Sequence, residues 1–143
     1  MEMASLLGML GLISAEDIKT HHIRDIEIYL FAIVGVAYHM LFHRIGILDL
    51  IGGMAVGALV YGVSVFSDEA IGKGDALIFM LTGSFLGLKA NALLVWLSSL
   101  LLAIFGVVMI CLGKKKMKDH IPMAPFIFVA YVLMIVMNGG KLL

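Results

Sequence analysis

The sequence predicts an all-α integral membrane protein with six transmembrane helices and both termini on the outer side of the membrane. Three observations lead to this fold class. First, the 143 residues are 62% hydrophobic and only 14% charged, whereas soluble domains carry about 25% charged residues. Second, long apolar segments recur along the chain between short polar stretches. Third, lysines and arginines gather in alternate polar stretches. A water-soluble fold would leave too much of this apolar surface exposed.

Each apolar segment is expected to form a helix, because unpaired backbone groups are costly in lipid. The alternating pattern of a transmembrane barrel is missing from the sequence. The polar stretches "EDIKTHHIRD", "HR", "SDEAIGKGD", "LKAN" and "GKKKMKDH" separate the segments. We therefore expect one polytopic membrane domain over residues 1–143, with helices over residues 1–20, 26–43, 45–66, 70–89, 91–112 and 121–138.

The first and fourth helices have apolar cores that are shorter than a membrane span, which needs about 20 residues. Extending the fourth helix back from Lys89 to that length starts it near Ala70. Asp75 then lies roughly one turn inside the apolar layer. The same reasoning from Met1 places Asp17 about one turn inside. The two aspartates are therefore expected at matching depth, near the same face of the membrane.

Glycines at GxxxG spacing predict close packing between the third and fourth helices. Gly53 and Gly57 have this spacing in "GGMAVG", and Gly83 and Gly87 have it in "GSFLG". Small residues four apart allow helix backbones to approach closely in lipid, although such spacing also arises by chance in a glycine-rich chain.

The distribution of basic residues predicts which side of the membrane each loop occupies. With the N-terminus outside, seven basic residues lie on the cytoplasmic side and three on the outer side. This bias follows the positive-inside rule and favours an N-out, C-out topology with both aspartates near the cytoplasmic face. The inner residues are Lys19, Arg24, Lys73, Lys114, Lys115, Lys116 and Lys118, and the outer ones are Arg44, Lys89 and Lys141.

Ionisable groups inside a membrane are expensive and are functional candidates by default. Two carboxyls brought close together cannot both ionise, so the pair shares one proton. The ionised member can then take a proton from water while the protonated member polarises a carbonyl, which is how aspartic proteases hydrolyse peptides. The alternative interpretation is that each aspartate only caps a helix end at the membrane interface. Gly72 and Gly74 favour the functional interpretation for Asp75, because glycine lets a substrate backbone approach closely.

Other classes of site have weaker support in the sequence. His39 and His43 lie four residues apart but lack a third ligand, so no metal site and no cofactor are expected. The net charge of zero suggests no nucleic-acid partner. The single cysteine, Cys111, excludes an internal disulfide and a zinc module built on CxxC. The lipid bilayer is the expected surrounding, and the oligomeric state is open.

Three segments resemble the type IV prepilin peptidases, which are polytopic aspartic proteases that remove prepilin leaders. "GKGDALIFMLTGSFLG" resembles the family's G-x-G-D segment, which contains one catalytic aspartate. In "DIKTHHIRD", Asp17 takes the place of the family's other catalytic aspartate. It lies six residues before Ile23, the first residue of the step Ile23-Arg24-Asp25. "IPMAPFIFVAYVL" resembles the family's Ile-Pro-x-x-Pro-Phe start of the last helix, with Pro122 and Pro125. Arg24 departs from the family's usual proline, and Ala76-Leu77 departs from its common Val-Lys.

The resemblance implies an intramembrane aspartic endopeptidase of the inner (cytoplasmic) membrane, with Asp17 and Asp75 as catalytic residues. Its substrates would be prepilin-like membrane proteins, cut at the cytoplasmic face. Larger family members also methylate the new N-terminus and carry paired CxxC motifs, which this chain does not have, so N-methyltransferase activity is not expected. Two alternatives are a small ion- or proton-coupled transporter and a non-catalytic factor for pilus or secretion assembly.

Overall fold

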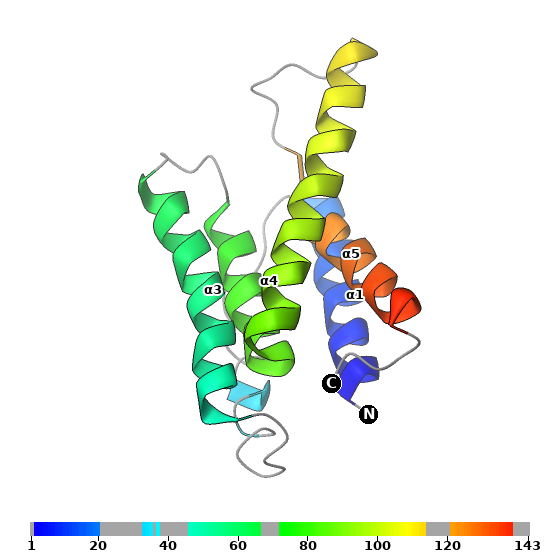
Figure 1. Cartoon of the computed structure of the whole chain (residues 1–143). Coiled ribbons are helices and arrows are strands. Elements are labelled where there is room, and N and C mark those ends of the chain that lie inside the picture. Colours follow the sequence, from blue (N-terminus) through cyan, green and yellow to red (C-terminus); the bar gives the residue numbers. More distant parts are fainter. Residues whose placement is uncertain are drawn as a thin grey trace.

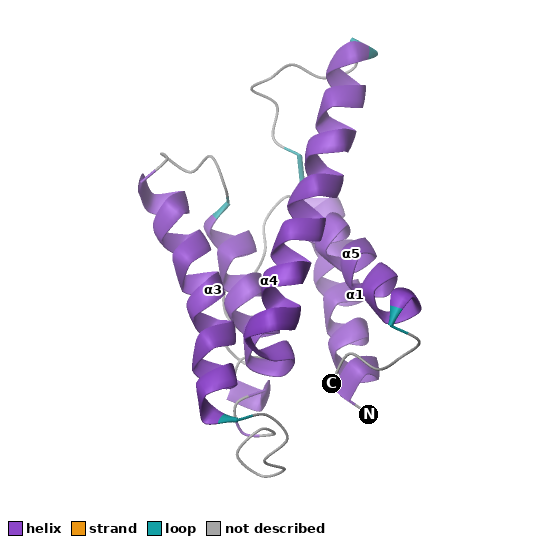
Figure 2. Ribbon diagram, in the orientation of Figure 1, coloured by secondary structure: helices purple, strands orange, loops and turns teal. Residues whose placement is uncertain are grey.

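The computed structural model describes residues 2–20, 33–35, 37, 46–66, 72–113 and 121–138. Four long helices make up most of this part of the chain, and no strand occurs in it (Figures 1 and 2). They are α1 (Glu2–Thr20), α3 (Ile47–Phe66), α4 (Lys73–Cys111) and α5 (Ala124–Met137). The helices expected over residues 1–20, 45–66 and 121–138 correspond to α1, α3 and α5.

The helix α4 turns back on itself at Gly87 (Figure 1). It therefore consists of a first arm, residues 73–86, and a second arm, residues 88–111. Gly87 has φ 73° and ψ −176°, a conformation that glycine adopts far more readily than residues with a Cβ. A hydrogen bond of 2.9 Å joins the side chain of Asn91 to the carbonyl of Phe79. In a straight helix these residues would stand roughly 18 Å apart along the axis. The two arms are therefore the helices expected separately over residues 70–89 and 91–112.

Asn91 stabilises this reversal, because both polar atoms of its side chain form hydrogen bonds. Its Nδ2 group donates to the main-chain oxygens of Phe79 and Gly53, at 2.9 and 2.8 Å. Its Oδ1 accepts a hydrogen bond of 2.7 Å from the Thr82 hydroxyl. Asn91 and Thr82 are fully buried, and buried polar groups are costly unless they are paired. The cluster joins both arms of α4 to α3.

Glycines allow α3 to pack closely against the first arm of α4. A Cβ on Gly53 would collide with the carbonyl of Gly83, and a Cβ on Gly57 would collide with the main chain of Met80. The backbones meet here without intervening side chains, as the GxxxG spacing in α3 predicts. Gly83 and Gly87 both take part in this contact, since a Cβ on Gly53 would also lie 2.9 Å from the main-chain carbon of Gly87, the site of the chain reversal.

The core lies between α1, α5 and both arms of α4, with Leu94 as a fully buried residue of the second arm. On α1, Leu6, Leu10, Ile13 and Asp17 follow one another at spacings of three or four residues, so they share the buried face. The side chains that pack against this face include Tyr131 of α5, which is completely buried. Asp17 thus ends a stripe of apolar residues.

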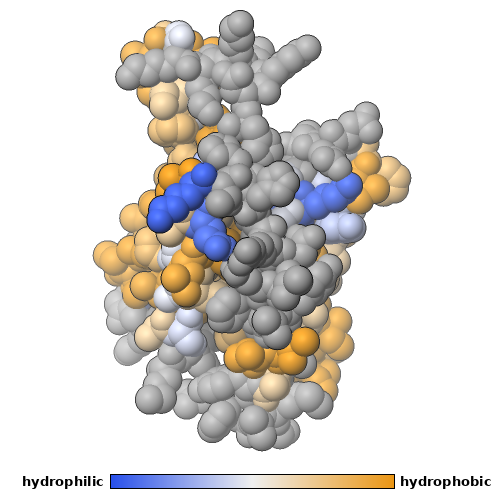
Figure 3. All heavy atoms as spheres, turned by 180° about the vertical axis from the view of Figure 1, so that it is seen from behind, coloured by the Kyte–Doolittle hydropathy of each residue, from blue (hydrophilic) through white to orange (hydrophobic). Residues whose placement is uncertain are grey.

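The helices α3 and α4 are each long and apolar enough to cross a membrane, by length and composition. Their outer faces carry exposed apolar side chains such as Leu48 and Phe66, which are 83% and 93% exposed. Figure 3 shows apolar residues over much of the described surface on the face that it presents. Such a surface suits lipid rather than water. These features indicate a membrane protein.

Of the helix expected over residues 26–43, only residues 33–35 and 37 are described, and they are helical. Gly35 is buried against α4, where an added Cβ would lie 2.7 Å from the Ser84 hydroxyl and 2.6 Å from the ring of Phe85. The expected second helix therefore has a contact on the first arm of α4.

We expect Gly57→Ala to lower the free energy of unfolding by about 1–3 kcal/mol, the usual cost of overpacking. The added methyl group meets main-chain atoms of Met80, which cannot rotate away. Gly62→Ala is the matched control on the same helix, because no atom lies within 4 Å of its added Cβ. Helix propensity alone should leave that variant as stable as the wild type or slightly more stable. Unfolding in detergent micelles measures both, and equal stability of the two variants would contradict the close contact.

Candidate active site

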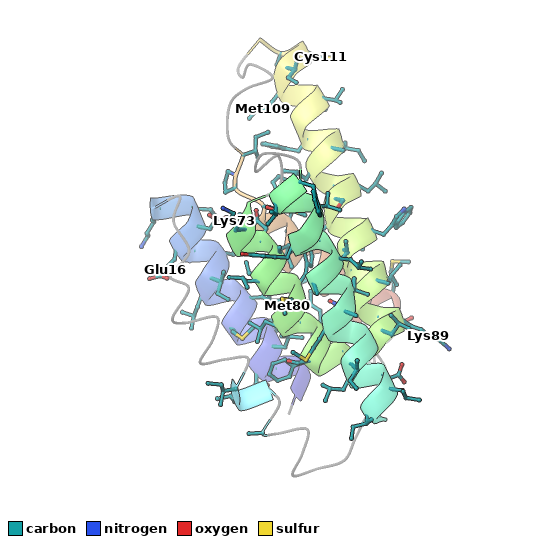
Figure 4. All side chains as sticks on the ribbon, turned by 90° about the vertical axis from the view of Figure 1, so that its left-hand side faces the viewer. Glu16, Lys73, Met80, Lys89, Met109 and Cys111 are labelled. Carbon is teal, nitrogen blue, oxygen red and sulfur yellow. The ribbon has the colours of Figure 1, made fainter. Side chains whose placement is uncertain are left out.

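Asp17 lies in the last turn of α1, where helical periodicity directs it inward. It follows Ile13 by four residues on the buried face, and it is only 6% exposed. Its neighbour Glu16 is partly exposed and points away from α4 (Figure 4). The two acids are adjacent in sequence, but the 100° rotation per residue gives only Asp17 access to the interior.

Asp75 lies in the first turn of α4 and is 7% exposed. Ile78 and Phe79, three and four residues later, are completely buried on the same side of the helix. Gly72 precedes the helix as its N-cap residue, and its carbonyl accepts the hydrogen bond from Ala76 at 3.2 Å. A Cβ on Gly72 would lie 2.7 Å from Oδ2 of Asp75. The carboxyl of Asp75 thus occupies space that a side chain at position 72 would need.

The N-terminus of α5 binds the carboxylate of Asp17. The main-chain N–H of Ala124, the first residue of α5, donates a hydrogen bond of 3.2 Å to Oδ2 of Asp17. Helix N-termini have free N–H groups and a partial positive charge, so they attract carboxylates. The contact joins segments that are 107 residues apart in sequence.

Three helix ends meet at this site. Figure 1 shows the C-terminal end of α1 and the N-terminal ends of α4 and α5 near one level of the molecule. Asp17 lies in the last turn of α1 and Asp75 in the first turn of α4. Figure 4 shows Lys73 near this level and Lys89 at the far end of the first arm of α4. The helix ends that carry the two aspartates therefore lie near one level of the molecule (Figure 1), as the matching depth predicts.

Two carboxyls in such an arrangement can hold one proton between them and act as an acid and a base. The described residues include no group of three or more His, Cys, Asp or Glu side chains that could hold a metal ion. Such a pair can transfer protons to and from a water molecule and a carbonyl group.

The other residues singled out in the sequence fall into three groups. Gly74 lies inside the first turn of α4 without a positive φ, so it does not need glycine's conformational freedom. Pro122 and Pro125 flank Ala124, the donor to Asp17. Ile23 and Asp25, like the histidines at positions 39 and 43, lie outside the described residues.

Two residues of the site had no signal in the sequence. Ala124 acts through its main-chain N–H, which every residue except proline has, so its identity gives no indication. Ser14 lies one turn before Asp17 on the same face of α1 and is 7% exposed. A serine within an apolar run is ordinary, and only its burial beside Asp17 draws attention to it.

Comparison with protein families matches residues 4–107 to the type IV leader peptidase family. The chain belongs to this family. The matched residues contain Asp17 and Asp75 and end before α5, so the contact of Ala124 with Asp17 comes from the structure alone. Neither the curated proteins nor the solved structures provide a match.

For a leader peptidase with this geometry, we expect Gly72→Ala to lower kcat by about 10- to 100-fold, because a small displacement of a reacting group has that effect. The added methyl group would press on the carboxyl of Asp75. Gly8→Ala on α1 is the control, because its Cβ meets no atom within 4 Å. Cleavage of a prepilin-like substrate measures both variants, with unfolding followed on the same samples. Wild-type cleavage by Gly72→Ala would show that the carboxyl of Asp75 tolerates a neighbour at position 72.

Proposed function

We propose that this protein is an intramembrane aspartic endopeptidase that removes the leader peptide of type IV prepilin-like proteins. The observation that carries the proposal is the burial of Asp17 and Asp75, on two helices whose ends lie near one level (Figure 1), in a chain of the leader peptidase family. A buried pair of acids is costly in a fold that needs apolar contacts, and such groups in membrane segments are functional candidates.

The reaction would begin with a water molecule held between the two carboxyls. The ionised carboxyl takes a proton from the water, whose oxygen attacks the carbonyl carbon of the scissile bond. The protonated carboxyl gives its proton to the carbonyl oxygen, which forms a neutral tetrahedral intermediate. The intermediate then returns one hydroxyl proton to the second carboxyl, while the first protonates the leaving nitrogen and the C–N bond breaks. Both carboxyls end in their starting states.

We further propose that the chain is a single membrane domain over residues 1–143, with six transmembrane helices and both termini outside. The site would then face the cytoplasm, in the inner membrane, where the N-terminal leader of a prepilin meets its hydrophobic helix. The basic-residue bias supports this orientation, as does the placement of Lys73 and Lys89 at opposite ends of the first arm (Figure 4). Without paired CxxC motifs, we expect cleavage and no methylation of the product.

Asp17→Asn and Asp75→Asn should each abolish cleavage of a co-expressed prepilin, with a loss of at least about 1000-fold. The two residues act as one unit, so the double variant should lose no more than either single variant. Asp49→Asn is the matched control, because Asp49 is exposed in the first turn of α3. All three variants should insert and fold.

Substantial cleavage by either single variant would refute the aspartic mechanism. Loss of prepilin export with unchanged cleavage would point instead to the non-catalytic assembly factor. Loss of ion flux in the same variants, without any cleavage by the wild type, would point to the transporter.

Topology is tested by single cysteines introduced after replacement of Cys111, which is exposed. Cysteines at Lys19 and Lys73 should resist an impermeant thiol reagent added to intact cells, whereas a cysteine at Lys89 should react. All three should react after the membrane is permeabilised. Labelling at position 73 in intact cells, with protection at position 89, would place the aspartates on the outer side, away from a cytoplasmic leader.

A further inference from the structure

The first four residues of α5, Ala124 to Ile127, differ in the acceptors that their main-chain N–H groups can reach. Phe126 and Ile127 donate to the carbonyl of Met123, at 2.9 and 3.1 Å. Pro125 has no N–H group. The main-chain N–H of Ala124 takes no part in the hydrogen bonds within this turn, and it donates to Asp17 instead. The sequence around Pro125 thus leaves this turn with a single donor for Asp17.

This hydrogen bond distinguishes the two carboxyls. Both aspartates lie near a helix N-terminus, since Asp75 occupies the first turn of its own helix and Asp17 faces α5. Only Asp17 accepts a hydrogen bond from a main-chain N–H among the described residues. Asp75 is buried to nearly the same extent, at 7% exposed, without such a donor in the part of the chain that the structure describes. An N–H donor favours the charged form of a carboxyl, whereas burial near a like charge favours the neutral form.

We propose that the N-terminus of α5, through the main-chain N–H of Ala124, holds Asp17 as the charged member of the pair and thereby leaves Asp75 as the protonated member. The assignment rests on the proposed function and adds roles to it. Asp17 is the base that takes the proton from water, and Asp75 is the acid that gives its proton to the substrate carbonyl. Ala124 is a positioning residue, since it acts through Asp17.

The C-terminal end of α1 places partial negative charge near the carboxyl of Asp17. The N-terminus of α5 offsets this charge from the other side of the carboxylate. Lys19 and Lys73 are exposed near the site, and exposed charges are screened by water and salt. The buried contact with Ala124 is therefore the interaction that separates the two carboxyls.

Two carboxyl-specific reagents distinguish an ionised carboxylate from a protonated carboxyl. An epoxide such as 1,2-epoxy-3-phenoxypropane is opened by an ionised carboxylate, which forms an ester. A diazoacetyl amino-acid ester with Cu²⁺ esterifies a protonated carboxyl and releases N₂. We expect mass spectrometry of the purified, full-length protein to find the epoxide ester on Asp17 and the diazo-derived ester on Asp75. The reverse pattern, or equal labelling of both aspartates by the epoxide, would overturn the assignment.

A main-chain substitution tests whether Ala124 is the cause. Replacing Ala124 by lactic acid changes its N–H to an ester oxygen and keeps the side chain. We expect epoxide labelling of Asp17 to fall at least about fivefold, together with kcat, while KM stays the same. The matched control replaces Ile127 by its hydroxy acid, which removes a hydrogen bond of the same turn without touching Asp17.

An equal loss of labelling in both ester variants would assign the effect to helix stability and overturn the role of Ala124. The labelling pattern does not depend on substrate turnover. A protein that labels as expected but cleaves no prepilin would therefore refute the proposed function alone. A protein that cleaves prepilin but shows the reverse labelling would refute the charge assignment alone.

Discussion

The chain reversal within α4 is the constraint on which the rest of the structure depends. Gly87 permits the turn, but a turn among apolar helices leaves polar atoms that water does not reach. Asn91 meets this need with three hydrogen bonds, to Phe79, Gly53 and Thr82. Because two of these partners belong to α4 and one to α3, the same side chain closes the hairpin and holds the neighbouring helix. Asp75 begins the arm that this cluster fixes, only four residues before Phe79.

The candidate active site lies at helix ends, namely the C-terminal end of α1 and the N-terminal ends of α4 and α5. A helix interior satisfies its own main-chain groups, so it offers no donor to a carboxylate, whereas its first turn does. Three helix termini lie near one level at the aspartates (Figure 1), and the first turn of α5 gives the buried carboxylate of Asp17 a main-chain partner. This arrangement suits a protease in lipid, because main-chain donors carry no net charge to be buried with the pair. Gly72 leaves the room in which Asp75 turns toward this site.

The sequence was informative about the site where side chains carry the chemistry. Asp17 and Asp75 stand out because acids are rare in apolar segments, and helix length alone placed them at one depth. The steric demand at position 72 was not evident from the sequence, because an added Cβ there meets Oδ2 of Asp75 at 2.7 Å, one helical turn along the chain. Ala124 was beyond the reach of sequence reasoning, because its contribution is a main-chain N–H.

The sequence by itself determined the all-helical class, the apolar character of the spans and the glycine contact along α3, because these follow from local composition and helical period. The tertiary structure alone decided which groups at the shared depth touch. Helical period directs a side chain toward the interior but does not say which neighbour it meets there. That choice depends on how α5 docks against α1 through residues such as Tyr131 and Ile13, and on which N–H of α5 the preceding hydrogen bonds leave free. The pairing of Asp17 with α5 is a consequence of packing, over 107 residues of separation that no local pattern encodes.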